Sequence, residues 1–181
     1  HLKPDALKGA RIGVLRKAMG YQPDVDAAFE RAVAALKAVC DDAAATEIYT
    51  AGQWGDAELE VLLYELKADL NAYLTSSGAP VKSLAGVIAF NKQNAGTEMR
   101  YFAQELFEQA EAKGPLTDRE YLDARDKARR LAGPEGIDAA LKKDNLDALV
   151  APSMSPAWPT DPINGDHFTG AGYGAAAVAR Y

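Results

Sequence analysis

The sequence predicts an α/β fold that is rich in helix. Two short apolar runs, residues 10–16 and residues 146–152, are typical of buried strands. Between them lie longer segments in which apolar residues recur every three or four positions, which is the spacing of amphipathic helices. Because so few strands are visible, we expect mixed sheet strands in an incomplete domain that takes further strands from elsewhere.

The first part of the chain predicts a strand–helix–strand unit. A helix is expected to begin at Pro23 and Asp24, with Val25, Phe29, Val33 and Leu36 along one stripe. Residues 46–50 form a weaker strand candidate. Such a unit is the building block of a parallel or mixed sheet.

The middle of the chain predicts helices. Periodic apolar residues indicate them at residues 56–75, 83–90, 98–112, 117–131 and 133–143. Thr117 and Glu120 have the spacing of a capping box for the fourth of these helices. No repeat or low-complexity linker divides the chain, so we expect residues 1–181 to form a single unit.

Composition restricts the possible partners. The 181 residues carry 20 basic and 26 acidic side chains, a net charge of −6, which argues against nucleic acid as a partner. No apolar run is long enough to cross a bilayer, so no membrane partner is expected. The single cysteine, Cys40, excludes an intrachain disulfide and a zinc site built on cysteine pairs.

The sequence lacks a complete catalytic set. It has no phosphate-binding loop, and no nucleophile elbow surrounds Ser153 or Ser155. Tyr64, Glu65 and Lys67 lie together on the predicted helix 56–75. We interpret them as part of a solvated helix face, because charged side chains are rarely buried without partners.

The segment "WPTDPINGDHF", residues 158–168, gathers polar and aromatic side chains. It contains the only internal histidine, His167, together with Asp161 and Asp166, so a metal site at these three residues is one hypothesis. Asn164 and Gly165 are a strong turn signal. The segment is therefore an active site, a pocket wall or a turn-rich loop.

Several stretches together resemble the C-terminal part of amidase-signature enzymes, with the closest resemblance to bacterial peptide-amidase-like members. They are "LLYELKADLNAYL", "YFAQELFEQAEAKGPLTDREYL", "RRLAGPEGIDAALKKDNLDALVAPS" and "PAWPTDPINGDHF". The opening "ARIGVLR" and the helix that follows it also fit. The resemblance covers nearly the whole chain and depends on the order and spacing of these stretches.

This resemblance implies hydrolysis of carbon–nitrogen amide bonds by a Ser–cis-Ser–Lys triad. The triad and its Gly/Ser-rich signature lie upstream of the matched region, so none of the catalytic residues can be assigned to this chain. We therefore expect a fragment that is inactive alone, with the missing N-terminal catalytic part and a small-molecule or peptide amide substrate as its partners. The family's mechanism requires no cofactor and no metal.

The resemblance also implies that residues 158–168 lie near the substrate entrance. The candidates for substrate binding are Trp158, Asn164, Asp166, His167 and Phe168. The alternative for this segment is a structural loop held by its turn. The alternative for the chain is a non-catalytic α/β module that binds a ligand or partner, or that associates with itself. The sequence leaves cytoplasm and periplasm equally open.

Overall fold

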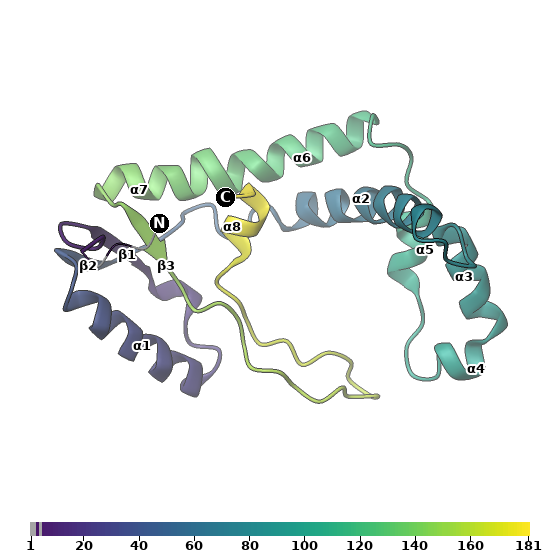
Figure 1. Ribbon diagram of the computed structural model, residues 1–181, viewed down its shortest axis with the longest axis horizontal. Coiled ribbons are helices and arrows are strands. Elements are labelled where there is room, and N and C mark those ends of the chain that lie inside the picture. The colour runs from purple at the N-terminus through teal and green to yellow at the C-terminus, as the bar shows by residue number, and fades with distance from the viewer. Residues whose placement is uncertain (1–2, 4) are drawn as a thin grey trace. The chain divides into compact units, whose positions relative to one another are not determined.

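The computed structural model describes residue 3 and residues 5–181 (Figure 1). This part of the chain divides into two compact units. The first contains the described residues up to Trp54 together with Arg129–Thr160 and Asp166–Tyr181, and the second contains Gly55–Ala128 and Asp161–Gly165. Among the described residues, no helix is both long enough and apolar enough to cross a membrane.

The first unit is built on a three-stranded parallel sheet. Strand β1 (Arg11–Leu15) lies in the centre, with β2 (Asp42–Thr46) on one side and β3 (Ala148–Val150) on the other. Gly13 of β1 stands opposite both Ala44 and Leu149. Both predicted apolar strands are confirmed, and these three strands pair in parallel where the sequence also allowed mixed pairing.

Strand β2 lies earlier in the chain than the sequence predicted. The expected strand at residues 46–50 is wrong, because pairing with β1 ends at Thr46. The register is fixed where the chain enters the sheet, since the amides of Asp41 and Asp42 both donate to the carbonyl of Ala10. Beyond Thr46 the chain leaves the sheet, and the amide of Ala51 donates to the carbonyl of Ile48 in a turn.

Helix α1 (Pro23–Lys37) connects β1 to β2 and confirms the predicted strand–helix–strand unit. It begins as predicted at Pro23, whose missing N–H costs nothing in the first turn. The side chain of Gln22 caps it by accepting a hydrogen bond from the amide of Val25 at 2.8 Å. The predicted apolar stripe packs on the sheet, forming a core with Ile12, Val14, Val33 and Ala43 at its centre.

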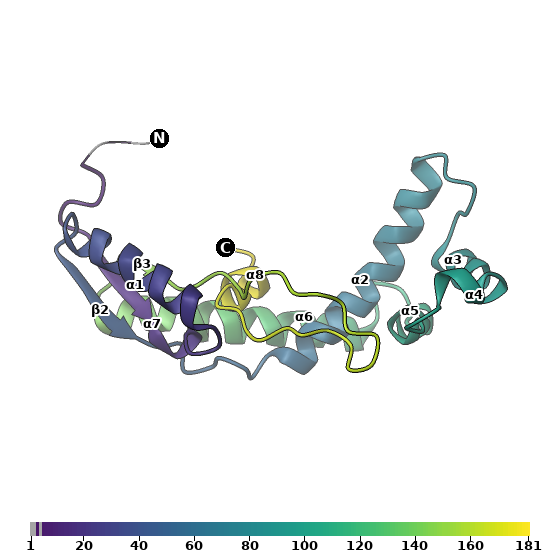
Figure 2. The ribbon, with the colours of Figure 1, turned by 90° about the horizontal axis from the view of Figure 1, so that it is seen from below.

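A long helical segment leads to β3. Helix α6 (Arg119–Ala132), the π-helical turn η2 (Gly133–Ile137) and helix α7 (Asp138–Asp144) follow one another without a break. The π-turn coincides with Pro134, which has no N–H for a regular helical hydrogen bond. Helix α1 covers one face of the sheet and α7 lies on the other (Figures 1 and 2).

The remaining helices of the first unit are short. The turn η1 (Arg16–Ala18) follows β1, and helix α8 (Gly174–Ala179) packs against η2. The hydroxyl of Tyr181 donates to Asp138 at 2.9 Å, which fastens the chain after α8 to the start of α7. Gly174, the last of three glycines in residues 170–174, is the first residue of α8.

The second unit is helical. It contains α2 (Gly55–Ser76), α3 (Leu84–Gln93), α4 (Ala95–Glu98), α5 (Glu105–Glu111) and the part of α6 up to Ala128. Its core is formed by Leu63, Leu84, Ile88 and Ala110. The helices predicted at 56–75 and 83–90 are confirmed.

The helix predicted at 98–112 is wrong over its first half, because regular helix begins only at Glu105. Gln104 is buried at this point, with 9% of its surface exposed. Its side chain donates to the carbonyl of Ile88 at 3.2 Å and accepts from the amide group of Asn91 at 3.0 Å. These bonds to α3 fix the chain before α5, whereas a continuous helix would turn this side chain elsewhere.

The polar side chains of α2 form a partly buried network, so their interpretation as a solvated face is wrong. Tyr64 is 2% exposed, and its hydroxyl donates to Glu120 at 3.1 Å. Lys67 donates to the carbonyls of Glu111 and Lys113, at 2.5 and 2.8 Å, which satisfies free carbonyls at the end of α5. The predicted capping box is wrong, because α6 begins at Arg119 and the carbonyl of Asp118, rather than that of Thr117, accepts its first helical hydrogen bond, from Leu122.

The close packing around Gly13 predicts a cost for any side chain there. A Cβ atom at this position would lie 2.6 Å from methyl carbons of Leu146, Leu149 and Thr46. We expect Gly13→Ala to lower the free energy of unfolding by about 1–3 kcal/mol, measured by urea denaturation. Gly96→Ala in α4 is the control, because its Cβ would meet nothing within 4 Å. Equal stability of the two variants would contradict this packing.

The environment of Tyr64 predicts a loss of stability at high pH. Burial, and then the hydrogen bond to Glu120, raise the pKa of Tyr64 to about 12. An exposed tyrosine in the unfolded chain ionises near pH 10. Between about pH 10 and 12 only the unfolded state loses this proton, so the free energy of unfolding falls as pH rises.

Denaturation curves recorded from pH 9 to 12 test this expectation. Tyr64→Phe should remove part of the fall in stability, whereas Tyr73→Phe should leave it unchanged, because Tyr73 is 65% exposed. If wild type and Tyr64→Phe lose stability in parallel over this range, Tyr64 ionises equally in both states.

Candidate functional site

A long hairpin follows β3 and returns to α8. Its two legs pair at the base, where Met154 and Ala171 form an antiparallel bridge and the amide of Ser155 donates to the carbonyl of Gly170 at 2.9 Å. The ring of Tyr21 packs directly on this pairing, since a Cβ on Gly170 would lie 2.6 Å from it. Glycine at 170 therefore allows the leg to lie against the loop that precedes α1.

Three of the five predicted site residues come together on this hairpin. The indole N–H of Trp158 donates to Asp166 at 3.3 Å. The rings of Trp158 and Phe168 meet edge to face, with centroids 5.9 Å apart and planes at 64°. Phe168 remains 52% exposed. The two legs thus present a small aromatic surface, with one carboxylate orienting the indole.

The other two predicted residues do not join this group. Asn164 belongs to the turn Asp161–Gly165, where it donates through its side chain to Asp161 at 2.8 Å. Asp161 also accepts from the amides of Ile163 and Asn164, and Gly165 has φ +82°, so the predicted Asn-Gly turn is present. His167 is exposed.

The carboxylate of Asp161 is engaged within this turn rather than directed at a metal. Within residue 3 and residues 5–181, no three side chains of the His, Cys, Asp or Glu type lie close enough to hold an ion. The geometry gives no support to a metal at Asp161, Asp166 and His167. The hydrogen bonds that Asp161 accepts within the turn order the tip of the hairpin.

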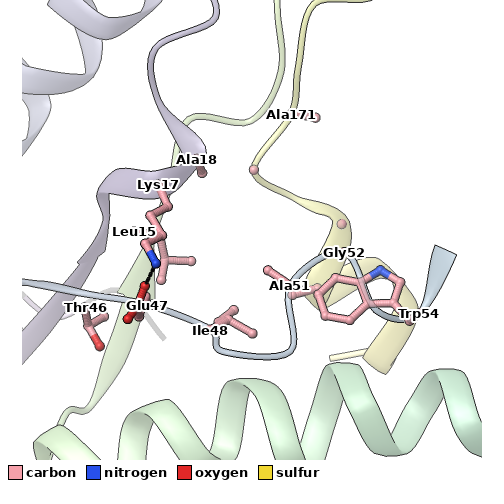
Figure 3. Close-up of a pocket in the computed structure, with 13 residues that line it drawn as sticks. Leu15, Lys17, Ala18, Thr46, Glu47, Ile48, Ala51, Gly52, Trp54 and Ala171 are labelled. Atoms are coloured by element: carbon pink, nitrogen blue, oxygen red, sulfur yellow. Dashed lines mark ion pairs between the residues drawn. The ribbon is translucent and has the colours of Figure 1, made fainter.

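A pocket of about 230 Å³ lies beyond the carboxyl ends of β1 and β2 (Figure 3). Its lining residues come from the end of β1 and the turn that follows it, from the end of β2 and the loop that leads to α2, and from the chain that enters α8. They are Leu15, Lys17 and Ala18; residues 46–48, 51, 52 and 54; and residues 171, 172, 174 and 175. Most of these side chains are apolar. Ligands of open parallel sheets commonly bind at this end of the strands.

The charged side chains at this pocket neutralise each other. Lys17 and Glu47 form an ion pair, drawn as a dashed line in Figure 3. Their hydrogen bond raises the pKa of Lys17 and lowers the pKa of Glu47, so both are ionised at neutral pH. The pocket therefore offers apolar walls and no net charge.

A second pocket, of about 340 Å³, adjoins the first. It lies beyond β1 and β3 and shares Leu15, Ile48, Gly172 and Ala175 with the first pocket. Its further walls come from Leu149, Ile137 and Leu141. The sheet order β2-β1-β3 places a topological switch point at β1, and a crevice is expected there.

Sequence reasoning missed these pockets. The ends of the predicted strands at residues 16 and 152 could have indicated this edge of the sheet. The erroneous strand at 46–50 concealed the loop that supplies Glu47, Ile48 and Ala51. Small residues such as Ala51 carry no chemical signal of their own, so only the fold brings them into a site.

Solved structures of peptide amidases are similar to nearly the whole chain. The complex of a peptide amidase with the competitive inhibitor chymostatin gives a TM-score of 0.89 and 44% identity, over 98% of this chain and 36% of that protein. The native peptide amidase from Stenotrophomonas maltophilia gives a TM-score of 0.83 and 44% identity, with the same two coverages. An amidase family protein from Bacillus anthracis, 24% identical over 97% of this chain and 31% of that protein, shares the fold with a TM-score of 0.56.

A sequence comparison agrees with these structures. A probable amidase of Arabidopsis thaliana is 40% identical over 91 residues, which are 49% of this chain and 17% of that protein. No family model matches the chain.

The chain is similar to peptide amidases over nearly its whole length, which confirms the resemblance that its sequence implied. It spans about a third of the length of those enzymes, 36%. The predicted helix-rich α/β fold is confirmed by the same comparison.

Proposed function

We propose that this chain is the C-terminal portion of an enzyme that hydrolyses carbon–nitrogen amide bonds, with peptide amides as its substrate class. The observation that carries the proposal is 44% identity over 98% of the chain to peptide amidases. The proposal concerns the whole protein, because the chain spans only 36% of those enzymes. A non-catalytic binding module is less favoured, since it offers no reason for this similarity.

In this proposal the chemistry and the substrate contacts lie on different parts of the protein. The family's mechanism uses a serine that attacks the carbonyl, while a lysine acts through a second serine on its proton. Those residues belong to the upstream catalytic part. The chain supplies no triad residue, and it is expected to be inactive alone.

The hairpin supplies the substrate contacts in this proposal. Trp158 and Phe168 offer an aromatic edge, and Asp166 fixes the indole by accepting its N–H. Asn164 orders the tip, and the exposed His167 lies between Asp166 and Phe168 in the sequence. Aromatic side chains with one polar anchor are well suited to hold an apolar peptide group.

Ammonia release from a peptide amide tests the proposed function. The full-length protein encoded by the gene should release ammonia, whereas the 181-residue chain alone should not, because it has no nucleophile for the carbonyl. Coupled detection of ammonia measures both. An inactive full-length protein, or an isolated chain as active as the full-length one, would refute the proposal.

Substitutions on the hairpin test its contact with the substrate. In the full-length enzyme, Phe168→Ala and Asp166→Ala should raise KM about three- to tenfold, because each disturbs the aromatic edge. Phe90→Ala and Asp69→Ala are matched controls on exposed helix positions and should not change KM. If KM is unchanged in both hairpin variants, the hairpin does not contact the substrate and is a structural loop.

A further inference from the structure

We propose that the apolar pocket beyond β1 and β2 binds an apolar side chain of the peptide amide substrate. The inference rests on the proposed function and adds the pocket shown in Figure 3 to the substrate site. It assigns a role to residues of the β2–α2 connection, which no comparison with a known protein assigns.

The size of the pocket suits a single side chain. Its volume is about 230 Å³, whereas an apolar cavity of about 150 Å³ in another protein accommodates benzene. The cavity is open because small side chains line it, among them Ala18, Ala51 and Ala171. A leucine or phenylalanine side chain would therefore fit, and a longer polymer would not.

The charge of the pocket suits an uncharged ligand. Lys17 and Glu47 compensate each other, so neither a free carboxylate nor a free amine gains a net attraction. Leu15, Ile48 and Trp54 supply apolar contact area. A neutral amide with an apolar side chain meets both conditions.

One leg of the hairpin connects the aromatic edge to the pocket. Phe168 lies on the leg that runs into Ala171 and Gly172, and those two residues line the pocket. Both features belong to the same compact unit. A peptide in contact with Trp158 and Phe168 thus has an apolar pocket at the end of the same leg.

The structure permits a direct test by filling the pocket. In the full-length enzyme, Ala51→Phe should raise about tenfold the ratio of KM for a peptide amide ending in phenylalanine to KM for one ending in alanine. The value of kcat should change little, because the catalytic residues lie elsewhere. Ala51→Leu is a milder variant in case the larger ring disturbs folding, and Ala72→Phe on α2 is the control.

A binding measurement separates this inference from the proposed function. Trp54 lies in the pocket, and its emission is isolated as the difference between Trp158→Phe and Trp158→Phe/Trp54→Phe, which also removes the signal of the hairpin. N-acetyl-leucinamide should change that emission saturably in the full-length protein, and Ala51→Phe should abolish the change.

The outcomes are distinct. An inactive enzyme that still shows the saturable change would refute the proposed function and support the pocket as an apolar amide site. If the enzyme is active but Trp54 emission does not change, and Ala51→Phe does not alter substrate selectivity, the proposal that this pocket binds a substrate side chain is refuted. That result is expected if another segment of the enzyme or a second copy fills the space.

Discussion

The pairing of β1 with a strand on each side is the constraint on which the first unit depends. β1 is only five residues long, yet it fixes the register of segments that are far apart in the sequence, Asp42–Thr46 and Ala148–Val150. Gly13 makes this possible, because the side chains of Leu146, Leu149 and Thr46 occupy the space that a side chain at position 13 would need. The two apolar faces of the sheet are then closed by α1 and α7.

The candidate site follows from that register. In a parallel sheet all strands end at the same edge, so the chain leaves β1, β2 and β3 close together. The residues of the following loops that line this space are mostly small or apolar, and the space remains open as two adjoining pockets. The hairpin after β3 returns to this edge, and its base is held by backbone hydrogen bonds and by Tyr21.

The sequence predicted those elements whose own residues determine them. The strand at β1 is a short apolar run, and the helices α1 and α2 have apolar residues at helical spacing. The Asn164-Gly165 sequence favours a turn by its own chemistry. β2 was misplaced because its alanines have weak strand preference, and the partner that makes them a strand is β1. The network of Tyr64 and Lys67 was misjudged because its partners come from α5 and α6. Trp158 and Phe168 were named as candidates only through the family resemblance, and their ring contact was not predicted. The pocket was not predicted either, since it is assembled from separate segments.

A crystal structure of the full-length enzyme with a competitive peptidic inhibitor tests the central claim most directly. We predict electron density for an apolar inhibitor side chain between Leu15 and Ala51, with the neighbouring residue of the inhibitor against Trp158 or Phe168. An inhibitor bound elsewhere, with side chains of the protein itself filling the space between Leu15 and Ala51, would contradict the account.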